Sequence, residues 1–237
     1  MTELSKEQRV RYSRNIMVDE VGTEGQKRLL ASSVFVLGCG ALGSVAAAYL
    51  AGAGVGRIIV ADFDTVDISN LQRQLTFSEG DAGTDKAGAL ARRLREINSG
   101  IEVIAVSGLV NADKARELFR GNDFIIDASD NPDTKYMIDA VCGELSLPYP
   151  IAGVLAMRGQ VMTHVPGSAA YSDFFPESAG SAYTPCSIGG VLGPLPGMVG
   201  SIQALEAIKY LTGAGQLLTD RLLIIDGATM KFSEVAI

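Results

Sequence analysis

Histidine and cysteine are scarce in this sequence, and tryptophan is absent. The one histidine, His164, leaves little room for a histidine-based triad or a multi-histidine metal site. The three cysteines, Cys39, Cys142 and Cys186, form no C-x-x-C pair, so we predict neither a disulfide framework nor a zinc site. Catalysis, if present, must rely on other groups.

Long apolar runs and excess positive charge are also lacking. No stretch is apolar enough for a membrane helix, and the polar start MTELSKEQRVRYSRN does not resemble a secretory signal. The net charge of −7 argues against a broad nucleic-acid surface. We therefore expect a cytoplasmic protein with no membrane partner and no nucleic-acid partner.

Strand and helix patterns alternate over the first two thirds of the chain. Ser5 with Gln8, and Thr23 with Gln26, have capping-box spacing and predict two short opening helices. The alternation then predicts a Rossmann-like α/β fold, with a mostly parallel sheet and helices on both faces. The predicted strands are 33–37, 57–61, 102–106 and 124–127, and the predicted helices include 45–50, 86–97, 112–119 and 134–145.

The pattern changes after Pro148. Strands at 149–154 and 160–164, joined by a turn at 157–159, predict an antiparallel C-terminal extension that makes the sheet mixed. A helix at 199–211 and a strand at 221–226 follow, and the Gly- and Pro-rich stretch 166–197 is predicted to be a mobile substrate loop. We expect one domain of 237 residues, divided into N-terminal helices (1–32), a nucleotide-binding half (33–147) and a second half (148–237).

A glycine motif follows the first predicted strand. Gly38, Gly40 and Gly43 fit G-x-G-x-x-G between a strand and a helix, where backbone N–H groups approach phosphate oxygens. Asp62 ends the next strand, the position from which a carboxylate bonds ribose hydroxyls. The motif predicts nucleotide binding, although the same glycines can merely pack a helix on a strand, and NAD uses the same loop.

Candidate phosphate ligands follow Asp62. Arg73 offers a planar fork of donors and Lys86 a mobile charge, and both suit a reacting phosphoryl group, although each can also be a solvated surface cation. The other candidates are Asp64, Ser69, Asn70, Leu71 and Gln72.

Asp130 and Asn131 follow the fourth predicted strand, at the edge where ligands of a parallel sheet gather. Asp130 can hold Mg²⁺ between phosphate oxygens, or one of the pair can cap the next helix, and the two roles can coexist.

Together the blocks RYSRNI, VLGCGALGS, ADFDTVDISNLQRQ, TDKA, DASDN and GVLGPLPGMVGSIQALEAIK resemble the MoeB/ThiF/HesA family, relatives of ubiquitin-activating enzymes, over about residues 5–235. The resemblance implies a homodimer that uses ATP and Mg²⁺ to adenylylate the C-terminal glycine of a MoaD-like or ThiS-like sulfur carrier ending in Gly-Gly. The second half, 148–237, would then bind the carrier. By the same resemblance, Gly38, Gly40, Ala41 and Gly43 line the phosphates, Asp62 the ribose, Asn70, Arg73 and Lys86 the phosphoryl group, Asp130 holds Mg²⁺, and Arg14 reaches the neighbouring subunit's ATP site.

The sequence departs from this family in its cysteines. Many relatives hold a structural zinc in two C-x-x-C pairs, and neither pair is present, so we predict no zinc. Cys186 matches the place where some relatives carry a cysteine that bonds covalently to the carrier, although a free cysteine is more often a small buried hydrophobe.

Other functions stay open at this point. A relative can adenylylate a small molecule, a peptide terminus or a tRNA base, or act as a non-catalytic scaffold, and an NAD oxidoreductase shares the glycine motif. Retention of Asp62, Arg73, Lys86 and Asp130 argues against the scaffold. The sequence does not choose between thiamin, molybdopterin and other sulfur pathways.

Overall fold

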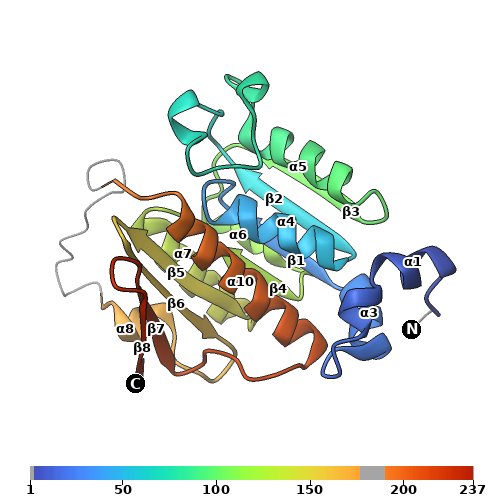
Figure 1. The fold of residues 1–237 in the computed structure, drawn as a ribbon. Helices are drawn as coiled ribbons and strands as arrows, with labels where there is room; N and C mark the ends of the chain where they lie inside the picture. Colours follow the sequence, from blue (N-terminus) through green and yellow to red (C-terminus); the bar gives the residue numbers. More distant parts are fainter. Residues whose placement is uncertain (1–2, 177–189, 237) are drawn as a thin grey trace.

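The computed structural model describes residues 3–176 and 190–236, which form two four-stranded sheets covered by helices (Figure 1). The first sheet is parallel with strand order β3-β2-β1-β4, and the second is antiparallel with order β5-β6-β7-β8. The strands are β1 (Ser33–Leu37), β2 (Arg57–Asp62), β3 (Glu102–Ser107), β4 (Phe124–Asp127), β5 (Tyr149–Leu155), β6 (Arg158–His164), β7 (Arg221–Asp226) and β8 (Lys231–Ala236).

Helices cover both faces of the parallel sheet, as predicted. The helices are α1 (Lys6–Arg11), α2 (Ser13–Ile16), α3 (Gly22–Ala31), α4 (Gly43–Ala53), α5 (Lys86–Ile97), α6 (Ala112–Phe119), α7 (Pro132–Leu145), α8 (Tyr171–Phe174) and α10 (Pro194–Thr212), with 3₁₀ turns η1 (Ile68–Asn70) and η2 (Glu79–Asp81). None of the described helices is long and apolar enough to span a membrane.

Alternating side chains of the central strands feed two hydrophobic cores. Val34 and Val36 of β1 belong to the core beneath α4, α5 and α10, whereas Phe35 and Leu37 belong to the core beneath α6 and α7. Figure 1 shows α4 and α10 on the near side of the sheets and α6 and α7 behind them. Because β1 and β4 are buried on both faces, their sequences are continuous apolar runs rather than alternating ones.

The antiparallel extension is confirmed, but it is hydrogen-bonded as a sheet of its own and not as the edge of one mixed sheet. Helix α7 connects β4 to β5, and the Ile125 N–H donates to the Pro148 carbonyl at 3.0 Å, which holds the start of β5 beside β4. The hairpin between β5 and β6 turns at Ala156 and Met157, with Ala156 at φ 52, so the turn lies one residue earlier than predicted. Strand β8 was not predicted.

Helix α10 joins the two sheets. The Gln203 amide donates to the Asp127 carbonyl of β4, while the buried Glu206 carboxylate accepts from Thr163 of β6 and from the Leu218 N–H. An added Cβ at Gly200 would lie 2.6 Å from the Leu42 carbonyl oxygen, so a glycine lets α10 approach the start of α4 closely.

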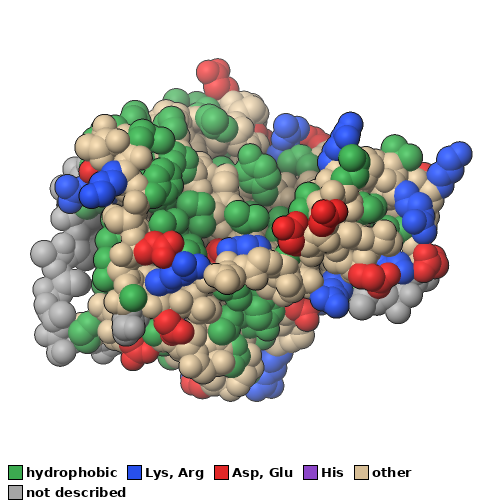
Figure 2. All heavy atoms as spheres, turned by 60° about the horizontal axis from the view of Figure 1, so that its bottom comes forward, with side chains coloured by type: hydrophobic (Ala, Val, Ile, Leu, Met, Phe, Trp, Pro, Cys, Tyr) green, Lys and Arg blue, Asp and Glu red, His purple; other side chains and the backbone are tan. Residues whose placement is uncertain are grey.

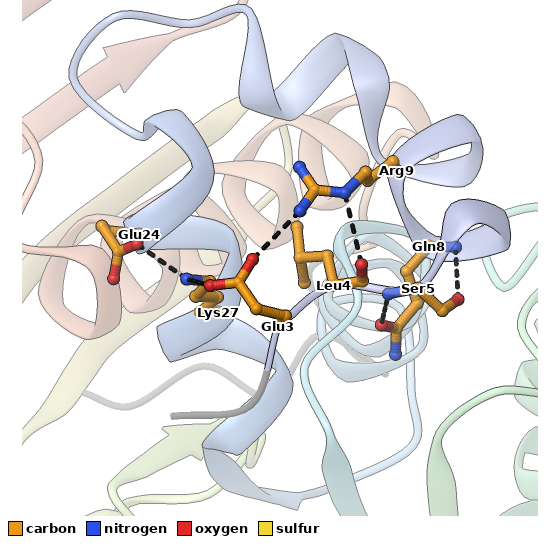
Figure 3. A network of polar contacts seen from close by, with 7 residues as sticks. All are labelled: Glu3, Leu4, Ser5, Gln8, Arg9, Glu24 and Lys27. Atoms are coloured by element: carbon orange, nitrogen blue, oxygen red, sulfur yellow. Dashed lines mark hydrogen bonds and ion pairs between the residues drawn. The ribbon is translucent and has the colours of Figure 1, made fainter.

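The N-terminal segment is held by the predicted capping box and by ion pairs (Figure 3). Ser5 and Gln8 exchange hydrogen bonds at the start of α1, and Lys27 of α3 lies 2.8 Å from a Glu3 carboxylate oxygen. The predicted cap at Thr23 is wrong: α3 begins at Gly22, two residues earlier than a Thr23 cap allows, and a short α2 adds a third opening helix.

The stretch predicted as a mobile loop is partly helical. Helix α8 lies within it, and α10 already begins at Pro194. Residues 177–189 lie outside the described residues, so mobility of the loop stays a prediction.

Candidate active site

A cavity of about 890 Å³ lies where the parallel strands end and extends over the antiparallel sheet. The chain builds β2 and β3 on one side of β1 and then crosses to β4 on the other side, so the carboxyl ends of β1 and β4 form a topological switch point. Open α/β sheets bind ligands at such points. We call the part beside these strand ends the nucleotide lobe, and the part over β5 and β6 the second lobe.

The glycine loop forms one wall of the nucleotide lobe. Gly38 has φ +100, and an added Cβ would lie 2.6 Å from the Ala128 carbonyl oxygen, so only glycine fits. Gly40 and Ala41 line the cavity, and a Cβ at Gly40 would meet only the Gln74 amide at 3.6 Å. Gly43 is different, because it is buried at the start of α4, does not line the cavity, and packs against the Gly38 carbonyl.

Asp62 is held rigidly beside this loop. One carboxylate oxygen accepts the Cys39 N–H at 2.6 Å, and the other accepts the Asp64 N–H at 2.9 Å. The carboxylate lines the cavity at the end of β2, where the sequence predicts a ribose ligand. Burial raises the pKa of the Cys39 thiol, and the Asp62 carboxylate raises it further, so this cysteine packs rather than reacts.

Two predicted cations reach the nucleotide lobe. The Lys86 ammonium, at the N-terminus of α5, is 8% exposed and lies 2.9 Å from the half-exposed Asp64 carboxylate. The Arg73 guanidinium donates to the Ser69 carbonyl at 3.0 Å and lines the cavity. Both therefore sit on the wall formed by the chain that follows β2.

The other residues of this segment divide into two groups. Asn70 lines the cavity, and its side-chain carbonyl closes the start of η1 by accepting the Asp67 N–H. Ser69, Leu71 and Gln72 do not line it. Gln74 was missed: it is 4% exposed, lines the cavity, and its side-chain carbonyl oxygen has no hydrogen-bond donor among residues 3–176 and 190–236.

Asp130 and Asn131 differ in the two roles that the sequence left open, which are Mg²⁺ binding and capping of the next helix. Asn131 caps α7 by accepting the Thr134 N–H at 2.9 Å. Asp130 is exposed, lines the cavity, and makes no hydrogen bond or ion pair with a described residue. No group of three potential metal ligands occurs among the described residues. Asp130 could contribute one carboxylate ligand to a Mg²⁺ ion that takes its other ligands from phosphates and water.

Lys135 is a further cation of the cavity that the sequence analysis missed. It projects from the first turns of α7, and its ammonium lies 2.8 Å from the Asp127 carboxylate and 2.8 Å from the Ala152 carbonyl. Asp127 is 2% exposed and ends β4, whereas Ala152 belongs to β5. Lys135 therefore contacts both sheets.

Aromatic side chains form the outer wall of the second lobe. Tyr136, Tyr171, Phe174 and Phe175 line it, and the Tyr136 hydroxyl donates to the Phe175 carbonyl at 2.5 Å. Helix α8 carries two of these residues, and a buried polar pair, Tyr149 and Asp139, accepts hydrogen bonds from its backbone. Nothing in the local sequence pattern marks these residues, because they come together only when α7, β5 and α8 pack.

The anchor of α8 has defined hydrogen bonds. The Tyr149 hydroxyl donates to the Asp139 carboxylate and accepts the Tyr171 N–H at 3.3 Å, while Asp139 also accepts the Ser172 N–H at 3.0 Å. Burial raises the pKa of Tyr149, and the bond to Asp139 raises it further. His164 packs on the Tyr149 ring with centroids 5.0 Å apart, in a structural role.

Arg14 and Cys142 lie away from the cavity. Arg14 is exposed on α2, where its guanidinium contacts the Met17 sulfur at 3.7 Å. Cys142 is buried within α7, and burial raises the pKa of its thiol. Cys186 lies outside the described residues, so its covalent role stays a prediction.

Surface charge is mixed on the face shown in Figure 2, where Lys and Arg side chains are interspersed with Asp and Glu around apolar areas. No broad basic area is visible on that face.

Comparison with known proteins gives consistent matches. The model of the ThiF family matches residues 12–237. The SAMP-activating enzyme E1 of Haloferax volcanii is 44% identical over 226 residues, which cover 95% of this chain and 84% of the relative. The adenylyltransferase and sulfurtransferase MOCS3 of Mus musculus is 39% identical over 234 residues, covering 98% of this chain and 51% of the relative.

Solved structures share the fold. The crystal structure of E. coli MccB with AMPCPP and MccA superimposes with a TM-score of 0.84 at 25% identity, covering 95% of this chain and 71% of that one. The chain spans about half the length of the mouse MOCS3 relative.

Proposed function

Because the chain belongs to the ThiF family and is an adenylyltransferase, we propose that it uses ATP to adenylylate the C-terminal glycine carboxylate of a ubiquitin-like sulfur-carrier protein. The observation that carries this proposal is the two-lobed cavity. Asp62, Lys86 and Asp130 gather in its nucleotide lobe, and the continuous second lobe gives room for a protein tail. The similarity to a SAMP-activating enzyme supports a carrier protein as the substrate.

The nucleotide lobe is suited to ATP. Gly38 and Gly40 bring backbone close to the cavity, and the orphan side-chain oxygen of Gln74 is an acceptor available to a ligand group. We assign the ribose to Asp62 and the phosphates to Asn70, Arg73 and Lys86. Ser69, Leu71 and Gln72 would shape the segment that carries Arg73.

The chemistry requires positioning more than proton transfer. A carboxylate oxygen bonds to the α-phosphorus, the bond from that phosphorus to the oxygen bridging the α- and β-phosphates breaks, and pyrophosphate leaves with the electron pair. No general base is needed, since a terminal carboxylate is ionised at neutral pH. Arg73 and Lys86 would donate to the phosphate oxygens as charge moves onto the leaving group. Mg²⁺, held by Asp130 and phosphate oxygens, would neutralise charge on the pyrophosphate.

The assembly we propose is a homodimer in a reducing compartment such as the cytoplasm. Arg14 is exposed and outside its own chain's cavity, which is the placement expected of a residue that completes a neighbour's site. We further propose that residues 33–147 bind the nucleotide and residues 148–237 the carrier, without a structural zinc. The sequence has no C-x-x-C pair, which is the basis for proposing reduced thiols.

The test is ATP–pyrophosphate exchange with and without carrier proteins ending in Gly-Gly. We expect carrier-dependent exchange that Asp130→Ala abolishes. Asp133→Ala is the matched control, because Asp133 lies in the first turn of α7 but does not line the cavity. Cys186→Ala should leave exchange intact even if Cys186 acts later. Exchange that no carrier stimulates, or that a peptide or small molecule stimulates instead, would contradict the proposal.

A further inference from the structure

We propose that Lys135 binds the terminal carboxylate of the carrier tail and holds it against the α-phosphate of ATP. This inference rests on the proposed function and assigns the residue that receives the nucleophile. Lys135 lies on the cavity wall, where it joins the nucleotide lobe to the second lobe through Asp127 and Ala152.

The ammonium of Lys135 has an unused donor. It carries three N–H groups. Two acceptors among the described residues use two of them, the Asp127 carboxylate and the Ala152 carbonyl, each at 2.8 Å. The side chain is 11% exposed, so these bonds fix the ammonium in place while it still borders the cavity. The third N–H is therefore available to a ligand.

The position of Lys135 matches the geometry of the reaction. The tail must enter through the second lobe, and the α-phosphate must lie in the nucleotide lobe. Four cations line the cavity within the described part of the chain: Arg73, Lys86, Lys135 and Arg158. Of these, Lys135 is the one that donates hydrogen bonds to both β4 and β5 among the described residues. It therefore stands where the two substrates must meet.

Electrostatics favours a fixed donor at this point. The carboxylates of Asp62, Asp64 and Asp130 line the same cavity and repel an incoming carboxylate. The nearly buried Asp127 carboxylate neutralises the charge of Lys135. The remaining N–H of Lys135 can therefore donate a directed hydrogen bond to the carboxylate nucleophile, and the neutral pair adds no net positive charge that would lower the reactivity of that nucleophile. Lys86 pairs instead with Asp64 on the opposite wall, where phosphate is expected.

The experiment compares two forms of one carrier protein, a C-terminal acid and a C-terminal carboxamide, binding to the enzyme with a non-hydrolysable ATP analogue. The wild-type enzyme should prefer the acid by about tenfold or more, the loss expected when a charged hydrogen bond is missing. Lys135→Met should bind both forms with the affinity that the wild type has for the carboxamide. Its affinity for the ATP analogue should not change.

Two further variants make the result decisive. Lys135→Met alone leaves the buried Asp127 carboxylate without its ion-pair partner, which can destabilise the fold. The double variant Lys135→Met with Asp127→Asn removes both charges and keeps an acceptor for the Ser129 N–H. This folded double variant should also lose the preference for the acid, whereas Asp127→Asn alone should keep it. Lys86→Met should weaken the ATP analogue and leave the preference intact.

Three outcomes would overturn the inference. An unchanged preference in the double variant means that Lys135 does not touch the carboxylate. Equal weakening of acid and carboxamide means that Lys135 only joins the two sheets. Weakening of the ATP analogue alone assigns Lys135 to the phosphates. If the wild type binds neither carrier form and no carrier stimulates exchange, the proposed function itself fails and this inference with it.

Discussion

Two glycines of the same loop should respond in opposite ways to one added methyl group. At Gly43 a Cβ would lie 1.8 Å from the Gly38 carbonyl oxygen and 2.9 Å from the Ala128 side chain. Neither neighbour can yield easily, because the Gly38 N–H is bonded to Ala61 at 2.8 Å and its own backbone is already in the left-handed region. At Gly40 the methyl would meet only the Gln74 amide at 3.6 Å.

The magnitudes follow from this contrast. Gly43→Ala overpacks a rigid backbone contact and should cost about 3 kcal/mol of unfolding free energy, or about 10 °C in Tm for a chain of this size. Gly40→Ala should leave stability unchanged or raise it by about 0.5 kcal/mol, since φ is not positive there. The same methyl protrudes into the nucleotide lobe and should weaken ATP binding by about tenfold.

The assay pairs urea denaturation with calorimetric titration of ATP for both variants. The reasoning is refuted if Gly43→Ala is as stable as the wild type, which would mean that the loop relaxes freely. It is also refuted if Gly40→Ala binds ATP with wild-type affinity, because the glycine would then serve only to pack α4 on β1. Either result would mean that the two glycines do not have separate roles, with Gly40 leaving room for phosphate and Gly43 letting α4 pack closely.

Three other predictions concern the dimer, the second lobe and pH. Arg14→Ala and Lys86→Ala enzymes, each inactive in exchange, should regain about a quarter of wild-type activity when mixed, because half of the dimers become mixed and carry one intact site; no recovery after subunit exchange would mean that Arg14 acts within its own chain. Tyr149→Phe should cost about 2 kcal/mol in urea denaturation, because buried Asp139 loses a donor, and should weaken carrier binding more than ATP binding; equal effects would show that α8 is not part of the carrier site. Hydrogen bonds from the Ser78 backbone and side chain, and the Arg92 guanidinium, hold the pKa of Asp81 below its ordinary value, so its stabilisation should be complete at neutral pH and fade below about pH 4; the stability gap between wild type and Asp81→Asn must therefore shrink on acidification, and a constant gap would contradict the assignment.

Elements with strong local signals were predicted to the residue. The strand Phe124–Asp127 and the helices Lys86–Ile97 and Ala112–Phe119 have clear apolar periodicity, and the latter two begin after Asp85 and Asn111 caps. Strand β8 was missed because its side chains are all exposed, so no alternation of apolar and polar residues marks it. Its pairing with β7 is what defines it.

The candidate site was predicted best where one short segment supplies it. Asp62, Arg73 and Lys86 follow directly from strand and helix ends, and the structure brings all three to one cavity. Lys135 was missed because its significance depends on Ala152, which belongs to a different sheet. Gly43 shows the converse limit: the spacing of the motif is correct, but only the packed loop reveals that its hydrogen faces backbone rather than ligand.

Helix α10 has a consequence for how this fold can be recombined. Its side chains bond β4 through Gln203 and the antiparallel sheet through Glu206, and Gly200 meshes with the backbone before α4. A chimera that takes β5 and β6 from a relative with a different carrier must therefore take a compatible α10, although that helix packs on the recipient's own nucleotide half. Because α10 bonds both halves of the chain, neither half should be replaceable without the other. Carrier preference is therefore expected to change through single substitutions of residues that line the second lobe rather than through exchange of one half of the chain.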